Sequence, residues 1–238
     1  MKRRKILHLA AGIALAAAKP VVAQEPAPAP TPTPALAVQP VDLELVLLVD
    51  ASASITTGAL DFQLRGHAAA FRDEKVKAAI PSGPRRGIAV TLARFDGPGS
   101  LKVLVPWRRL AGAADADAFA DAVAAVAAGD EAGATAIGSA VADALGLFKA
   151  TGFAADRRAI DIVSNGFSNA GVDPTIARDA AEAAGVTVNA LVILDEYDWL
   201  EGYYRQSVIG GIGAFVRTAD SKDSFAQALI AKLIDEIV

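Results

Sequence analysis

Three oxygen-bearing side chains occupy alternate positions directly after the first apolar run of the chain. The segment Asp50-Ala51-Ser52-Ala53-Ser54 has the pattern D-x-S-x-S and follows residues 43–49. Alternate side chains of extended backbone point to the same side, so one carboxylate and two hydroxyls can converge. Such oxygens suit a hard divalent cation, which keeps part of its water shell. The pattern therefore predicts a metal site, and the alternative is a serine-rich loop that caps the next helix.

A further candidate ligand, Thr135, lies in a turn bounded by glycines. Residues 133–138 read Gly-Ala-Thr-Ala-Ile-Gly and lead into a segment with helical spacing. A threonine at or next to a helix N-terminus can bind a metal through its hydroxyl or simply cap the helix. Taken alone, Thr135 fits either role.

The apolar pattern predicts the scaffold that must position these side chains. Continuous apolar runs are typical of strands covered on both faces, and a 3.6-residue period is typical of helices. We expect strands at residues 43–49, 88–95, 101–107, 160–164, 186–194 and 214–219. We expect helices at about 60–71, 113–128, 136–148, 174–184, 199–207 and 221–237.

This alternation predicts a doubly wound α/β fold with a mostly parallel six-stranded sheet and helices on both faces. The short link at residues 96–99, Asp-Gly-Pro-Gly, joins two expected strands and predicts one antiparallel edge strand. In open α/β sheets, ligands bind beyond the carboxyl ends of the strands. Asp50 and Asn165 both follow expected strands and are therefore expected at that edge.

Three motifs together resemble the von Willebrand factor A (vWA) domain over about residues 41–238. They are D-x-S-x-S, the Gly-Ala-Thr-Ala-Ile-Gly turn, and a strand that ends in Ser164-Asn165-Gly166. Residues 158–169 (RAIDIVSNGFSN) and 208–215 (VIGGIGAF) further resemble an exported bacterial branch of that superfamily, a domain of unknown function. The resemblance implies the fold and the site more strongly than the biological role.

The resemblance also implies a set of metal ligands. The metal-ion-dependent adhesion site (MIDAS) of the vWA family takes two serines, a threonine and two aspartates. Asp50, Ser52, Ser54 and Thr135 match this set, whereas Asn165 stands where the pattern has aspartate. Asparagine keeps an acceptor oxygen and loses a charge. The resemblance therefore implies a Mg²⁺ or Mn²⁺ site that binds its ion weakly.

The N-terminal segment has the composition of an export signal followed by a spacer. Residues 1–23 have a basic start, an apolar run and small residues before the expected cleavage site, as in a signal peptide. An uncleaved membrane anchor is the alternative, and only then would the chain contact a membrane. Residues 24–40 contain six of the 12 prolines and predict an extended linker. We expect one domain at 41–238, in the periplasm or secreted.

Charge and composition exclude several function classes. Residues 1–23 hold five of the 23 Lys and Arg and none of the 27 Asp and Glu, so the remaining chain has a formal charge of −9. Such a charge disfavours nucleic-acid binding. The chain has no cysteine, no G-x-S-x-G motif and no Walker A loop. We therefore expect a binding module and not an enzyme.

The expected partner is a protein that offers an acidic residue to the metal. Two alternatives remain: a metal-free scaffold with a degenerate site, and, least favoured, a metal-assisted hydrolase. Asp161, in an otherwise apolar strand, is expected to be a paired structural carboxylate. His67 is expected to be packed or exposed rather than catalytic. The acidic loop Asp195, Glu196 and Asp198 is expected to be solvated, with a role in binding as the alternative.

Overall fold

A computed structural model describes residues 38–53, 55–129 and 133–238, within one compact unit of residues 36–238. The strands are β1 (Gln39–Asp50), β2 (Ile88–Phe95), β3 (Lys102–Leu110), β4 (Phe153–Ser164), β5 (Thr187–Ile193) and β6 (Val216–Ala219). The helices are α1 (Thr57–Arg72), α2 (Glu74–Ala79), α3 (Ala113–Ala124), α4 (Ile137–Leu147), α5 (Pro174–Ala183), α6 (Leu200–Tyr203) and α7 (Lys222–Ile237), with short turns η1 (Phe148–Ala150) and η2 (Tyr204–Val208). Among these residues, no helix combines the length and apolar character needed to cross a bilayer.

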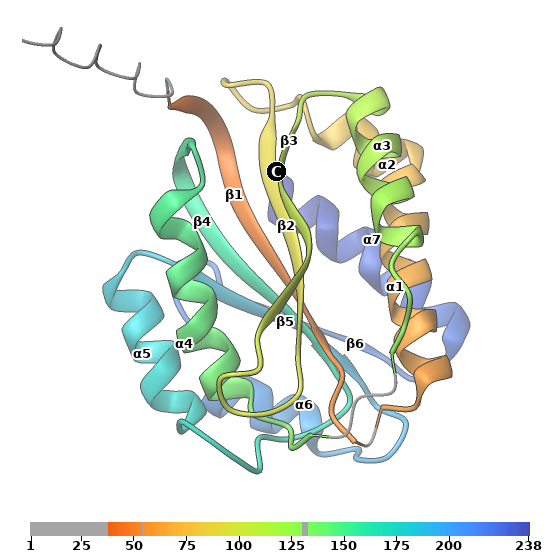
Figure 1. The fold of residues 1–238 in the computed structure, drawn as a ribbon, viewed down its shortest axis with the longest axis vertical. Helices are drawn as coiled ribbons and strands as arrows, with labels where there is room; N and C mark the ends of the chain where they lie inside the picture. Colours follow the sequence, from red (N-terminus) through yellow and green to blue (C-terminus); the bar gives the residue numbers. More distant parts are fainter. Residues whose placement is uncertain (1–37, 54, 130–132) are drawn as a thin grey trace, which may run out of the picture. The chain divides into compact units, whose positions relative to one another are not determined.

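The six strands form one sheet in the order β3-β2-β1-β4-β5-β6. All neighbouring strands are parallel except β3, which pairs antiparallel with β2 at the edge. Helices α1, α2, α3 and α7 cover one face, and α4, α5 and α6 cover the other (Figure 1). The predicted doubly wound fold with one antiparallel edge strand is confirmed.

The central strand β1 shows why its sequence is a continuous apolar run. Leu45 and Leu47 belong to the core under α1 and α7, while Val46 and Leu48 belong to the core under α4 and α5. Both faces of β1 are therefore buried, and alternation with polar residues is lost. The strand order reverses next to β1, which pairs with both β2 and β4.

The helices on the α1 side bury one face each. In α1, which covers the predicted helical segment 60–71, the side chains of Leu60, Leu64, His67 and Phe71 are buried. The final helix α7 begins with Ser221, whose hydroxyl accepts a hydrogen bond from the Ser224 backbone nitrogen at 3.1 Å. This cap supplies a partner to an N–H group that the helix itself leaves unsatisfied.

Some boundaries differ from the sequence-based expectation. Strand β4 begins at Phe153 rather than near residue 160, and β1 begins at Gln39, inside the predicted linker 24–40. Gln39 pairs with Phe153 through the backbone. Backbone pairing at an exposed end of a sheet does not need apolar side chains, so hydrophobicity alone did not mark these ends. Helix α2 was not predicted, and α3 ends at Ala124 instead of Ala128.

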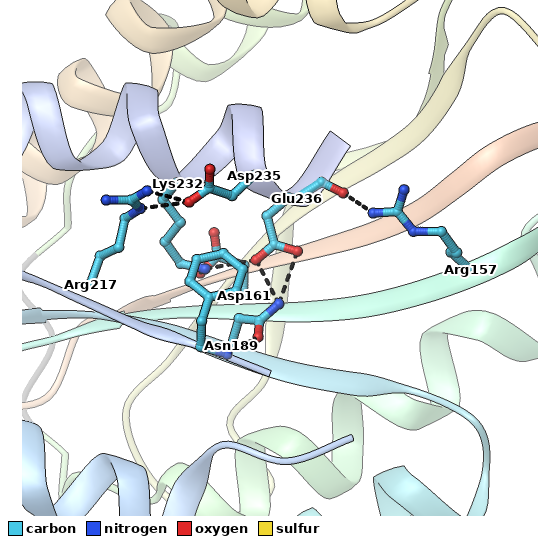
Figure 2. Close-up of polar contacts among 8 residues, drawn as sticks. Arg157, Asp161, Asn189, Arg217, Lys232, Asp235 and Glu236 are labelled. Atoms are coloured by element: carbon cyan, nitrogen blue, oxygen red, sulfur yellow. Dashed lines mark hydrogen bonds and ion pairs between the residues drawn. The ribbon is translucent and has the colours of Figure 1, made fainter. Parts of the chain in front are cut away.

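A cluster of buried charges lies between the sheet and α7 (Figure 2). We call Asp161, Asn189, Lys232 and Glu236 the ion cluster. The Lys232 ammonium lies 2.9 Å from Asp161 Oδ1 and 2.7 Å from Glu236 Oε1. Asn189 Nδ2 donates to both Glu236 oxygens, at 2.9 and 3.0 Å. The prediction that Asp161 is a paired structural carboxylate is therefore confirmed, and its partner is Lys232.

The ion cluster contains its own counter-ion. Burial raises the pKa of Asp161 and of Glu236, and the nearby ammonium offsets part of that rise. Burial alone would lower the pKa of Lys232, but the two carboxylates outweigh it and raise that pKa. Arg157 of β4 also donates to the backbone carbonyls of Glu236 and Ile237, as Figure 2 shows for Glu236. These contacts hold the last turn of α7 against the sheet.

Candidate metal centre

The candidate metal centre lies at the carboxyl ends of β1 and β4, where the strand order reverses. Asp50 is the last residue of β1, and Ser164 is the last residue of β4. The loop after β1 contacts the turn before α4, because Ala53 N donates to the Gly133 carbonyl at 2.8 Å. Segments more than 80 residues apart in the sequence thus meet at one edge of the sheet.

Asp50 is the buried carboxylate of this centre. Its Oδ1 accepts the Ser52 backbone N–H at 2.8 Å, and its Oδ2 accepts the Ser164 hydroxyl at 2.5 Å. Burial raises the pKa of Asp50; the hydrogen bonds from Ser164 and Ser52 oppose the rise, and the charge of Asp96 adds to it. Among the described residues, no basic side chain forms an ion pair with Asp50. A cation at this position would supply the missing charge.

Ser52 and Thr135 bring two hydroxyls together beside Asp50. Thr135 Oγ1 donates to Ser52 Oγ at 3.0 Å, and both side chains are buried. Thr135 does not cap helix α4, whose N-cap residue is Ala136 and has no side-chain capping bond. The Thr135 backbone is held in turn by Asn169, whose Oδ1 accepts the Thr135 N–H at 3.0 Å. The hydroxyl of Thr135 is therefore directed at the centre rather than at its own helix.

Asn165 follows β4 and completes the described part of the centre. Its side chain is 7% exposed, and its Nδ2 donates to Asp195 Oδ2 at 3.4 Å. Its Oδ1 is buried and has no hydrogen-bond partner among the described residues. Ser54, the remaining predicted ligand, lies outside the described residues. The site assignment of all five residues stays a prediction.

The chemistry of these side chains fits a hard divalent cation. One carboxylate, two hydroxyls and an amide oxygen without a partner are oxygen donors of the kind that Mg²⁺ and Mn²⁺ prefer. Within the described part of the chain, no three His, Asp or Glu side chains are grouped so that they could hold a metal by themselves. Any metal here would therefore depend on the hydroxyls, and one carboxylate favours modest affinity.

Two neighbours of the centre were not assigned to it from the sequence. Ser164 had been seen only as a strand end, yet it donates to Asp50. Asp195 had been expected to be merely solvated, yet it accepts a hydrogen bond from Asn165. Both follow from the strand order, because β4 lies between β1 and β5. The sequence indicated that both residues lie at the carboxyl ends of strands. Only the strand order shows which of these ends are neighbours.

Aromatic side chains support the loop after β4. Tyr204 is fully buried, and its hydroxyl donates to the Gly166 carbonyl at 3.0 Å. Tyr203 accepts the Ser168 N–H at 3.1 Å. Trp199 packs on Tyr203 and stays 49% exposed. Tyr204 therefore packs in the core and anchors the loop that carries Asn165.

Solved structures with the same fold are vWA domains. Proximal thread matrix protein 1 from the mussel byssus is 20% identical with a TM-score of 0.61, and the match covers 82% of this chain and 48% of that one. A von Willebrand factor type A protein from Catenulispora acidiphila is 15% identical with a TM-score of 0.59, covering 83% and 43%. The vWF domain of the type V pili tip protein Mfa5 from Porphyromonas gingivalis is 12% identical with a TM-score of 0.56, covering 83% and 97%.

These identities establish a shared fold, and the chain spans about half the length of the mussel protein. No curated protein matches the chain. The chain has the vWA fold, as the sequence motifs predicted. Within that class, it belongs to the family described as "Protein of unknown function (DUF1194)", whose model matches residues 40–238.

Proposed function

We propose that this chain is an exported protein-binding module that holds a divalent cation at the carboxyl edge of its sheet and binds a partner's carboxylate there. The observation that carries the proposal is the convergence of Asp50, Ser52 and Thr135; at the same edge of the sheet, Asn165 keeps a buried oxygen without a partner among the described residues. Asp50, Ser52 and Thr135 come from segments far apart in the sequence, and all their polar side-chain atoms are oxygens. By its place in the pattern, Ser54 belongs to the same set.

The residues of the centre have separate roles in this proposal. Asp50 supplies the negative charge, the hydroxyls of Ser52 and Thr135 supply neutral oxygens, and Asn165 supplies its amide oxygen. A bound divalent cation would provide a positive charge that attracts an anionic oxygen of the partner. Because Asn165 replaces a carboxylate, we expect Mg²⁺ or Mn²⁺ to bind weakly. In one structure of the mussel protein, the MIDAS motif is occupied by zinc, which adds Zn²⁺ to the ions worth testing.

Export and domain limits form part of the same proposal. Residues 1–23 would be a signal peptide, residues 24–40 a proline-rich spacer, and residues 41–238 the vWA-like domain. The pilus tip protein among the structural relatives supports a location outside the cytoplasm. The intact mass of the exported protein tests the cleavage. A mass that starts at Gln24 supports the signal peptide, whereas a mass with residues 1–23 retained supports the anchor.

A metal-free interaction scaffold is the second candidate. The hydroxyl of Thr135 donates to that of Ser52, and the hydroxyl of Ser164 donates to Asp50. Several polar groups of the centre therefore have hydrogen-bond partners without an ion. We do not propose a hydrolase. His67, the only histidine after residue 23, is fully buried, and its Nδ1 is 2.8 Å from the Gln63 carbonyl. It is therefore poorly placed to activate a serine of the centre.

Thermal melts of the purified protein test the metal directly. Mg²⁺, Mn²⁺ or Zn²⁺ at about ten times its dissociation constant should raise the midpoint by about 3–6 °C relative to EDTA. Asp50→Ala and the isosteric Asp50→Asn should lose this rise. Asp143→Ala is the control, since Asp143 is exposed on α4. If no ion shifts the wild-type midpoint, the metal-free scaffold is the better description.

A further inference from the structure

A pocket of about 510 Å³ opens beside the candidate metal centre. It lies among the first turn of α1, the carboxyl end of β5 and the start of α7. Gln63 and Asn165 line it; Asn165 is a predicted ligand of the centre, and the Gln63 Nε2 reaches the Asp50 carbonyl at a long 3.5 Å. The pocket and the centre therefore face the same edge of the sheet.

The buried polar atoms of the pocket are acceptors without donors. Gln63 is fully buried, and its Oε1 has no hydrogen-bond partner among the described residues. Asn165 Oδ1 also has no partner among the described residues, but the proposed function assigns that oxygen to the metal. A buried acceptor without a donor destabilises a protein, and such groups in native structures are normally satisfied by water or by a ligand. A ligand that carries hydrogen-bond donors would therefore satisfy this side of the pocket.

The charges around the pocket point the same way. Asp195 and Asp220 line it, and none of its described lining residues is basic. Asp220 accepts a hydrogen bond from the Ser224 hydroxyl at 2.8 Å, while Asp195 accepts a long bond from Asn165 at 3.4 Å. Both carboxylates keep accessible surface. A cationic donor would be attracted to this pocket, and an anion would be repelled.

The remaining wall of the pocket is apolar. Phe62, Ile193 and Phe225 line it, and the rings of Phe62 and Phe225 pack with centroids 5.0 Å apart. Basic side chains bury their methylene stems on apolar surface while the charged head reaches polar groups. A planar guanidinium also stacks on aromatic rings and carries five N–H donors, which suits a pocket with several acceptors.

We propose that this pocket binds an arginine side chain of the protein partner, next to the position where the metal centre binds that partner's carboxylate. The stem would pack on Phe62, Ile193 and Phe225, and the guanidinium would bond to Gln63, Asp195 and Asp220. This assignment rests on the proposed function in one respect, since it takes the arginine to come from the same protein. The pocket's own affinity does not depend on the metal.

Titration of the ¹⁵N-labelled protein with N-acetyl-arginine amide tests the pocket alone, because this probe has no carboxylate. We expect the amide signals of Ala59, Asp195 and Asp220 to shift and saturate, equally in EDTA and in Mg²⁺. N-acetyl-citrulline amide has nearly the same shape and no charge, and it should bind at least about five-fold more weakly. Equal binding of the two probes would overturn the proposal, because the pocket would then not select a cation.

Substitutions in and away from the pocket test where the arginine probe binds. Asp220→Asn and Asp195→Asn should each weaken the arginine probe about two- to five-fold, since both carboxylates are partly solvated. Asp143→Asn, which removes the same charge from exposed α4, should leave it unchanged. Ala59→Phe should block the pocket without a change of charge. If Asp143→Asn weakens binding as much as Asp220→Asn does, general attraction to an acidic protein explains the result, and the proposal is wrong.

A second probe separates this proposal from the metal site. N-acetyl-aspartate amide should bind only with metal present, and the amide signals of Ser52 and Thr135 should then shift. Arginine binding without aspartate binding supports the pocket and contradicts the proposed carboxylate site. Aspartate binding without arginine binding supports the metal site and contradicts the pocket. Saturation of the pocket by water alone would appear as no shift with the arginine probe, and it too would overturn the proposal.

Discussion

The ion cluster under α7 and the candidate metal centre both bury carboxylates, but they differ in how the charge is compensated. In the ion cluster, the ammonium of Lys232 lies within 3 Å of one oxygen each of Asp161 and Glu236. At the metal centre, Asp50 accepts hydrogen bonds from Ser52 and Ser164, and no basic side chain of the described residues pairs with it. One group carries its own cation, and among the described residues the other has none.

This difference shows that burial of a polar group does not by itself identify a functional site. A buried charge that is paired within the protein has a structural explanation. The ion cluster explains how α7 is held, because the Lys232 ammonium pairs with both carboxylates. The edge near Asp50 combines a buried carboxylate that has no described basic partner with the unpartnered oxygens of Gln63 and Asn165. Buried charges and polar atoms without partners are therefore a better indicator of a ligand site than burial alone.

The largest effect should come from removal of the cation of the ion cluster. Lys232→Met leaves Asp161 and Glu236 buried without an ammonium, and we expect the free energy of unfolding to fall by about 3–5 kcal/mol. Urea unfolding measures this. Arg205→Met is the control, because it breaks an exposed pair with Glu201, and it should cost less than about 1 kcal/mol. Equal losses in the two variants would mean that the buried ion cluster stabilises the fold no more than an exposed ion pair does.

A second test uses His67, which lies on α1 between the two groups. Burial lowers its pKa to about 4, and the charge of Lys232 acts in the same direction. The unfolded chain, with a pKa of about 6.5, binds the proton more readily, so stability is full above pH 6.5 and falls as the pH drops toward 4. Between pH 7.5 and 5, this residue should account for a loss of about 2 kcal/mol.

His67→Gln should remove that part of the pH dependence. The measurement is the free energy of unfolding of both proteins at pH 7.5 and pH 5, and the change between the two pH values is compared, since the substitution also alters packing. A smaller loss in His67→Gln supports a neutral, buried histidine. The same loss in both proteins would mean that His67 is protonated in the folded state or does not titrate in this window.

The smallest effect concerns the metal centre. Asn165→Asp adds a second carboxylate, and we expect Mg²⁺ to bind about ten-fold more tightly, since affinity rises with the charge of the ligands. The variant should also melt lower than wild type in EDTA, because Asp50 and Asp195 are like charges nearby. Calorimetric titration measures the first effect. Gln206→Glu, an exposed change of the same kind, is the control, and an unchanged Mg²⁺ affinity in Asn165→Asp would contradict the assignment.

Much of the fold followed from local patterns. Strand β2 has the predicted bounds, α1 covers the predicted helical segment 60–71, and the final helix α7 lies within the predicted range 221–237. Apolar period and capping residues are local properties, so one sequence suffices for them. The start of β4 and the short helix α2 were missed, because their residues are largely polar and carry no clear period.

The candidate site was predictable as a set of residues but not as an arrangement. The motifs marked Asp50, Ser52, Thr135 and Asn165, and the described residues do place these four at one edge of the sheet. The motifs contained no sign that Ser164 would donate to Asp50, 114 positions away, or that Asp195 would contact Asn165. Such contacts depend on which strands are neighbours.

The sequence by itself determined the class of the fold, the oxygen-rich chemistry of the edge and the replacement of a carboxylate by Asn165, since each depends on residue type and short spacing. Tertiary structure alone decided that Lys232 neutralises Asp161, that Gln63 keeps an unpartnered oxygen, and that an acidic and apolar pocket adjoins the centre. The physical reason is that compensation of a buried charge depends on distance in space, and the order of strands sets that distance.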